Sequence, residues 1–160
     1  MFYKNEFGVL GTPVYITVAI ITTSVICSIF VYSLLNIVEE SQTDIVKKQI
    51  EKIINEAENM FEYADSGSKT KVNVDFPESM NFAVFGTMPD NISKPSNLEL
   101  NENKSNNYYF VMQNKEICTY SSNARFCGES NDKIAILHHG KHSTCLELVS
   151  FDGKTYVKIY

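Results

Sequence analysis

An uncharged stretch near the N-terminus limits what this chain can fold into. The 32 residues from Phe7 to Val38 contain no Asp, Glu, Lys, Arg or His. As a helix, residues 14–38 alone would reach about 37 Å, whereas the hydrocarbon core of a bilayer is about 30 Å thick. The stretch therefore predicts a single membrane-spanning helix.

A cleaved secretory signal is the alternative interpretation of such a stretch. A signal has an apolar core of about 7–15 residues, followed by a cleavage site with small residues. Here the apolar stretch is longer and continues directly into a charged helical pattern. We therefore expect the span to be retained in the protein.

The residues at the two ends of the stretch predict its bounds and its orientation. Thr12 can cap a helix whose first residue is Pro13, so we expect a short segment 1–12 and a transmembrane helix 13–38. Lys4 precedes the span, whereas Glu39 and Glu40 follow it. The positive-inside bias then places residues 1–12 in the cytoplasm and the C-terminal domain outside the cell, held by a single pass.

The next segment has the periodicity of an amphipathic helix. Apolar residues recur there at spacings of four, three, four, three and four, and Ile54 and Phe61 widen the stripe: Val46, Ile50, Ile53, Ala57, Met60 and Ala64. Such a stripe covers an apolar surface elsewhere in the molecule. Residues 39–65 are therefore predicted to be a helical stalk that continues the membrane helix.

Residues 66–160 are predicted to form a β-rich extracellular domain. Seven runs have strand character, and turn residues separate several of them: KTKVNVDF, MNFAVFG, NYYFVMQ, EICTYS, KIAILHH, CLELVSF and KTYVKIY. Residues 88–107 are polar, carry two prolines and are predicted to be a long exposed loop. The fold class is thus α+β, with a long N-terminal helix packed on an antiparallel β-sheet or a small β-sandwich.

The order of these elements resembles that of archaeal type IV pilin-like membrane proteins. The residues that carry the likeness follow the apolar helix and read NEAENMFEYADSGSKTKVNVDFPESMNF. The resemblance covers roughly residues 8–86. It implies a subunit on the cell exterior whose helix stays in the bilayer or is extracted into a filament, where it contacts copies of itself or other pilin-like subunits.

The chain also departs from that family pattern at two places. A membrane peptidase usually cuts such proteins after a glycine that follows basic residues; Gly8 and Gly11 are the candidates here, and only Lys4 precedes them. Many pilins carry a glutamate early in the mature helix, and this span has none. The departures favour a minor pilin or a permanently anchored relative over a major filament subunit.

A segment rich in metal-ligating residue types supports a second hypothesis. His138, His139, His142 and Cys145 lie within eight residues and include every histidine of the chain. Imidazole and thiolate are ligands for zinc and copper. The alternative function is therefore a membrane-tethered extracellular metal-binding or redox module, although the adjacent His138 and His139 would face opposite sides of a strand.

The cysteine spacing predicts one disulfide. Cys118 and Cys127 flank eight residues, which suits a hairpin or a wide loop, and an extracellular domain is an oxidising environment. Cys27 lies within the span and is expected to be a small apolar residue. Cys145 is then free, metal-bound or a competitor for one of the other two.

The remaining patterns concern modification and partners. Asn91 and Asn103 fit the N-glycosylation pattern. All but one of the 14 basic and 19 acidic residues follow the span, so the outer part has a net charge near −5 and no basic stripe, which argues against nucleic acid as a partner. No phosphate loop, nucleophile elbow or dinucleotide fingerprint is present, so we expect no enzyme and no catalytic residues.

Overall fold

The computed structural model describes residues 7–90, 95 and 97–160. Its first element, α1, is a helix that extends over Phe7–Tyr63. Pro13 therefore lies inside the helix, and the predicted helix start at Thr12 and Pro13 is wrong. The chain divides into two compact units between Ser41 and Gln42.

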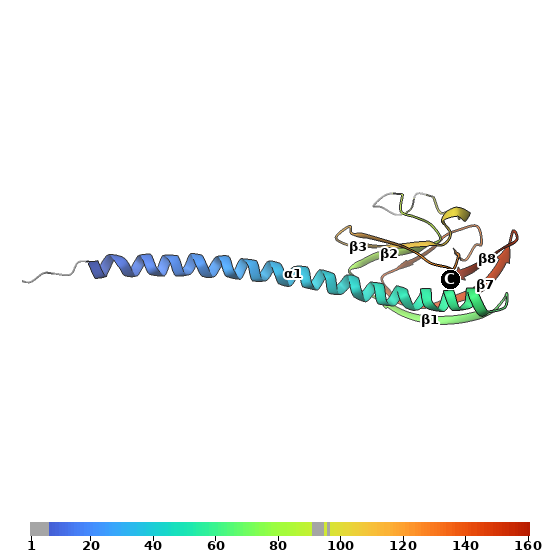
Figure 1. Ribbon diagram of the computed structural model, residues 1–160, viewed down its shortest axis with the longest axis horizontal. Coiled ribbons are helices and arrows are strands. Elements are labelled where there is room, and N and C mark those ends of the chain that lie inside the picture. The colour runs from blue at the N-terminus through green and yellow to red at the C-terminus, as the bar shows by residue number, and fades with distance from the viewer. Residues whose placement is uncertain (1–6, 91–94, 96) are drawn as a thin grey trace, which may run out of the picture. The chain divides into compact units, whose positions relative to one another are not determined.

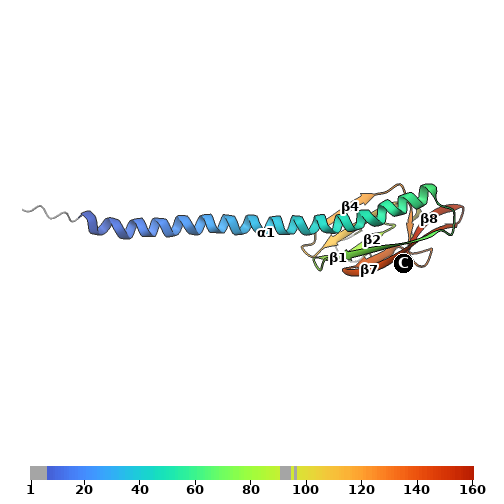
Figure 2. The same ribbon diagram turned by 90° about the horizontal axis from the view of Figure 1, so that it is seen from below.

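Residues 66–160 form two four-stranded sheets, shown in Figures 1 and 2. Sheet A has the order β1-β7-β8-β5 and sheet B the order β4-β3-β2-β6. A short 3-10 helix, η1, covers Glu102–Lys104. The strands are β1 Lys69–Phe76, β2 Met80–Phe85, β3 Asn107–Met112, β4 Ile117–Ser121, β5 Phe126–Cys127, β6 Ala135–His138, β7 Gly140–Phe151 and β8 Lys154–Ile159.

The strand pairing confirms the predicted α+β fold class. Neighbouring strands are antiparallel, with the exception of β5, which pairs with β8 in the parallel sense. Six of the seven predicted runs contain one strand each, and the seventh, CLELVSF, is the second part of β7, which begins earlier at Gly140. The sequence patterns missed β5, because two residues are too few to show an alternation.

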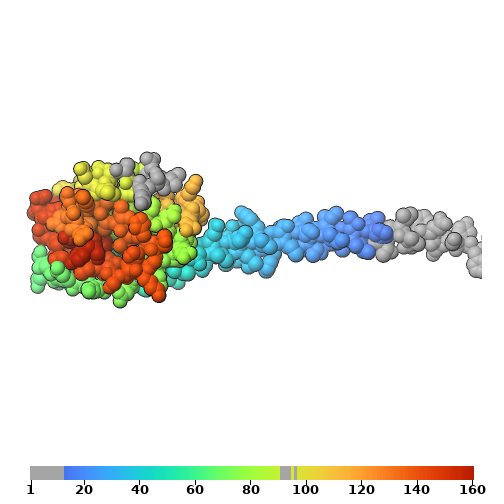
Figure 3. Space-filling view, turned by 180° about the vertical axis from the view of Figure 1, so that it is seen from behind, coloured from blue at the N-terminus to red at the C-terminus, as the bar shows by residue number. Residues whose placement is uncertain are grey.

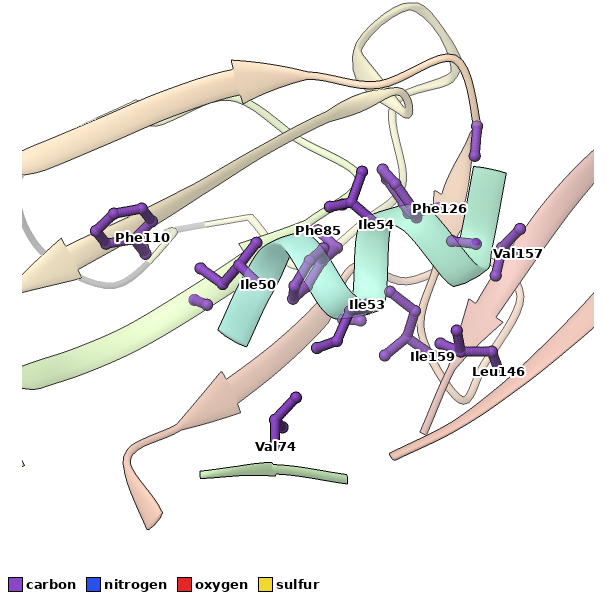
Figure 4. Packing of buried hydrophobic residues seen from close by; sticks show 14 of the residues in the cluster. Ile50, Ile53, Ile54, Val74, Phe85, Phe110, Phe126, Leu146, Val157 and Ile159 are labelled. Atoms are coloured by element: carbon purple, nitrogen blue, oxygen red, sulfur yellow. The ribbon is translucent and has the colours of Figure 1, made fainter. Parts of the chain in front are cut away.

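The apolar stripe of the second half of α1 is packed against both sheets. Its members Val46, Ile50, Ile53, Ala57 and Met60 are between 0% and 6% exposed. In Figure 4, Ile50, Ile53 and Ile54 project among side chains of sheet A and sheet B. The strands contribute Val74, Phe76, Met80, Ala83, Phe85, Phe110, Met112, Phe126, Ala135, Leu146, Leu148, Val157 and Ile159 to the same core. The amphipathic helix therefore joins the two sheets into one core.

The central strands of sheet B, β2 and β3, are largely buried on both faces. Residues that alternate with the helix-facing ones form a second cluster of Phe82, Val84, Tyr109, Val111 and Ile134, against which Leu100 packs. The segment predicted to be a long exposed loop supplies this cover in part. Pro95 and Ser105 in it are buried, and the main-chain N–H of Leu100 donates to Asp132 O at 2.7 Å. The prediction of an exposed loop is therefore wrong for these residues.

Candidate functional site

The first half of α1 presents an apolar surface that nothing in its own unit covers. Its large apolar side chains from Val14 to Val38 are between 46% and 78% exposed. Within Pro13–Tyr63, an 18-residue window is apolar enough for a membrane span and has none of its residues buried. The exposed side chains of residues 14–38 form the apolar surface of α1.

Four hydroxyl groups on this surface are satisfied within the helix. Thr17, Thr22, Ser24 and Ser28 each donate to the carbonyl oxygen four residues earlier, at 2.8 Å. These internal bonds remove the cost of placing a hydroxyl in an apolar environment. The polar residue types in the span are therefore compatible with lipid contact.

The four predicted metal-ligating residues are not brought together. His138 ends β6, His139 is the exposed residue between the two sheets, and His142 and Cys145 lie on β7. Cys145 lies three positions after His142, an odd offset, so their side chains leave opposite faces of the strand. Among the described residues, which include all four, no group of three or more His, Cys, Asp or Glu could hold a metal ion. The structure therefore does not bring the four residues together as a zinc or copper site, and metal binding stays a prediction.

The histidines instead join the end of sheet B to the start of sheet A. His142 Nε2 lies 2.7 Å from the carbonyl oxygen of His138, and because that oxygen can only accept, Nε2 carries the proton. The His142 ring also lies 6.2 Å from the ring of Phe76. These contacts hold the β6–β7 junction, where the chain passes between sheets across His139.

The predicted disulfide is not formed, and all four cysteines are free thiols. Cys118 lies on β4 opposite Phe110 in sheet B, whereas Cys127 lies on β5 opposite Lys158 in sheet A. The intervening residues thus pass from one sheet to the other and form no hairpin. This change of sheet is why the local spacing of the two cysteines was misleading.

The thiols of this pair are also poorly suited to chemistry. Burial raises the pKa of Cys118, and the neighbouring Glu116 carboxylate raises it further. Burial raises the pKa of Cys127 to about 12. Because the thiolate is the reactive and metal-binding form, both residues act as small apolar side chains. Cys27 lies exposed on the apolar surface of α1, and Cys145 is half-buried on β7.

The predicted modification positions have different surroundings. Asn91 lies outside the described residues. Asn103 is exposed in η1, while Ser105 of the same pattern is 1% exposed and donates its hydroxyl to Glu102 O at 2.8 Å. Gly8 and Gly11, the predicted cleavage positions, lie in the first turns of α1. Cleavage and glycosylation stay predictions.

Glu58 has a structural role that the sequence pattern did not reveal. Its carboxylate accepts from the Ser122 hydroxyl at 2.6 Å and from the main-chain N–H of Asn123 at 3.0 Å. The Ser122 hydroxyl in turn accepts from Ala124 N at 3.1 Å. Sequence periodicity places Glu58 on the solvated face of the helix, whereas the structure uses it to hold the β4–β5 connection against α1.

A hollow that the sequence did not predict lies beside sheet A. It has a volume of about 490 Å³ and is formed by three segments: 99–102, 131–132 and the β7–β8 hairpin. The main chains of Glu99 and Lys133 form an isolated antiparallel β-bridge, and the Glu102 side chain forms an ion pair with Lys154, so the separate segments are tied together. The hairpin turns at Asp152 and Gly153, whose φ values of 51° and 72° suit a tight turn. The segment 140–160, orange to red, covers much of the face shown in Figure 3.

No protein-family model, curated protein or solved structure matches this chain. What the structure shows is a long apolar N-terminal helix followed by two β-sheets, which is a pilin-like architecture. The likeness rests on this order of elements alone.

Proposed function

We propose that this protein is a single-pass cell-surface protein that acts as a structural or adhesive subunit, without catalytic activity. The observation that carries the proposal is the difference between the two halves of α1. Apolar side chains are exposed in residues 14–38, whereas those of residues 46–60 are buried against the sheets. The first half therefore needs a partner from outside its own chain, and the second half does not.

The bilayer is the partner that fits the apolar surface of α1. Its residues are apolar on every side of the helix, which is typical of a membrane span and not of a helix that lies on a protein core. The backbone and the hydroxyl groups noted above are satisfied internally, as lipid requires. We propose that residues 1–12 are cytoplasmic and that the β-rich part is extracellular.

Subunits of the same build are the second proposed partner. Ala19, Thr23 and Cys27 recur at intervals of four on the apolar surface, with Ser24 beside them. Small residues let helix backbones approach closely, and packing drives such association because lipid offers no hydrophobic incentive. We propose that the helix anchors the protein or assembles with pilin-like subunits in a surface filament, more as a minor than as a major subunit. An archaeal origin stays a prediction.

Cell fractionation and sequencing of the mature N-terminus test the anchor. The full chain should stay in the membrane after alkaline carbonate washing, and its mature N-terminus should lie at or before Thr12. A mature N-terminus beyond Val38 would show a cleaved signal and overturn the proposal. An epitope tag placed after Tyr160 should bind antibody on intact cells, and staining only after permeabilisation would overturn the orientation.

Oxidative cross-linking through Cys27 tests the helix contact. The full chain in its native membrane should give a Cys27-linked species that Cys27→Ser abolishes and Cys145→Ser leaves in place. If oxidation gives only the monomer and single molecules diffuse freely in the membrane, the proposed assembly is rejected. The proposed membrane anchor is unaffected by that result.

A further inference from the structure

The hollow beside sheet A is negatively charged. Glu99, Glu102, Asp132 and Asp152 line it, and Asn131 adds a neutral polar side chain. Glu102 is paired with Lys154. Among the described residues, no basic side chain forms an ion pair with the other three carboxylates. A ligand that enters this space therefore meets uncompensated negative charge.

Two aromatic residues and one aliphatic residue also line the hollow. Phe151 and Tyr156 stack with their ring centroids 4.3 Å apart and an interplanar angle of 16°, and Leu100 is the aliphatic residue. Aromatic faces attract cations, more strongly where water is partly excluded. A cation with an apolar stem would find contacts here for both of its parts.

The hydroxyl of Tyr156 is a second, independent feature of this space. Tyr156 is 1% exposed and lines the hollow, yet its hydroxyl forms no hydrogen bond with any described residue. Burial raises the pKa of Tyr156, so the hydroxyl stays protonated and can accept from a ligand donor while retaining its own proton. Among the described residues, the buried side-chain oxygens without a partner are those of Tyr109 and Thr144, so the Tyr156 hydroxyl keeps contact with solvent and is free to accept from a ligand donor.

The arrangement does not suit a bare metal ion. The described carboxylates of the hollow include no group of three that could hold one. A volume of about 490 Å³ lies instead within the range of small-molecule sites, about 300–1,000 Å³. The charge is thus spread around a space large enough for a group of several heavy atoms.

We propose that this hollow binds an organic cation, namely a primary ammonium or guanidinium group carried on an apolar stem. The cationic head lies among Glu99, Asp132 and Asp152, donates to the Tyr156 hydroxyl, and its stem lies on the Phe151–Tyr156 pair. A free amine and a basic side chain of a peptide present the same chemistry. The site lies wholly within residues 42–160 and is independent of the proposed membrane anchor.

Titration of the full chain in neutral detergent micelles tests the site. The probes are n-pentylamine, N-acetyl-lysine methylamide and n-pentanol as the uncharged counterpart, followed by amide chemical shifts and calorimetry. We expect saturable binding of the two cations, with shifts at Leu100, Asp132 and Gly153, and no binding of n-pentanol. Tighter binding of n-pentylamine assigns the site to free amines, and tighter binding of the blocked lysine assigns it to peptides. Absence of saturable binding at millimolar cation, or equal binding of n-pentanol, would overturn the proposal.

Matched variants separate the site from general charge attraction. Asp132→Asn with Asp152→Asn should weaken cation binding about tenfold, and asparagine preserves the positive φ of the hairpin turn. Asp65→Asn with Glu78→Gln removes the same charge from exposed positions outside the hollow and should leave binding unchanged. Tyr156→Phe removes only the unpartnered hydroxyl and should weaken binding about fivefold. An equal loss in the Asp65 and Glu78 pair would refute the site.

Discussion

The two halves of α1 differ in apolar content and have opposite surroundings. From Val14 to Val38 the large apolar side chains surround the helix and are all exposed, whereas from Val46 to Met60 they form one stripe and are buried. The distribution of apolar residues around the helix, together with their number, therefore indicates what kind of partner each half has. A stripe finds its partner in the same chain, whereas a helix that is apolar on every side needs a partner from outside.

Replacing Ile53 by Asp is the largest test of this difference. Ile53 is fully buried in the stripe, so a carboxylate there would lack water and partners and should lower the free energy of unfolding by about 5 kcal/mol. Denaturant unfolding of the full chain in micelles measures the loss. Ile29→Asp is the matched change in the apolar surface and should leave the unfolding of the β-sheets unaltered. Equal effects of the two changes would remove the distinction between the halves.

Ile26→Arg tests the other half of the comparison. Arginine at the centre of a span costs about 3 kcal/mol of insertion free energy. The variant should shift the protein from the carbonate-resistant membrane fraction to the soluble fraction, while the denaturation midpoint of the β-sheets stays unchanged. Full membrane retention together with destabilised sheets would reverse the roles that we assign to the two halves.

Glu58→Ala probes the polar side of the buried half. The change leaves the Ser122 hydroxyl and the Asn123 N–H without their acceptor and should cost about 1–2 kcal/mol of unfolding free energy. Glu62→Ala, an exposed position one turn further along, should cost less than about 0.5 kcal/mol. Thermal unfolding of both variants gives the comparison, and equal midpoints would show that the Glu58 contacts add nothing.

The smallest effect is expected on the outer face of sheet A. The Lys69 ammonium, 3.2 Å from Glu147, holds the pKa of that carboxyl below its ordinary value, and the Tyr160 hydroxyl adds to the effect. Because the folded-state pKa is lowered, the stabilisation is present above the ordinary pKa and is lost as the pH falls through the folded-state value. Thermal midpoints from neutral to acid pH should fall slightly more for the wild type than for Glu147→Gln. An identical pH dependence of the two proteins would exclude this contribution. The buried stripe of α1 contains no group that titrates, so it adds nothing to the pH dependence.

The elements whose signal is local could be predicted from the sequence. The periodicity from Val46 to Ala64 predicted the buried face of α1, since each turn of a helix repeats its contact with the core. The alternation in Lys69–Phe76 likewise predicted β1 and its inward residues, Val74 and Phe76. Such patterns are preserved because every residue in them meets the same surface.

Features that depend on distant segments could not be predicted in this way. The pairing of β5 with β8 needs the whole of sheet A to be in place. Cys118 and Cys127 are close in the sequence but belong to different sheets, and His142 and Cys145 are close but leave opposite faces of β7. The hollow beside sheet A is invisible in the sequence, because its carboxylates and aromatic residues come from three separate segments.

The self-contained hydroxyl groups of Thr22, Ser24 and Ser28 have a mechanical consequence for any bundle built from this helix. Neighbouring copies would be held together mainly by dispersion contacts. Few hydrogen bonds between helices would then fix how far one helix is shifted along the other. Under tension such copies can slip by a helical turn and find an equivalent fit, so a fibre of them would stretch before it breaks.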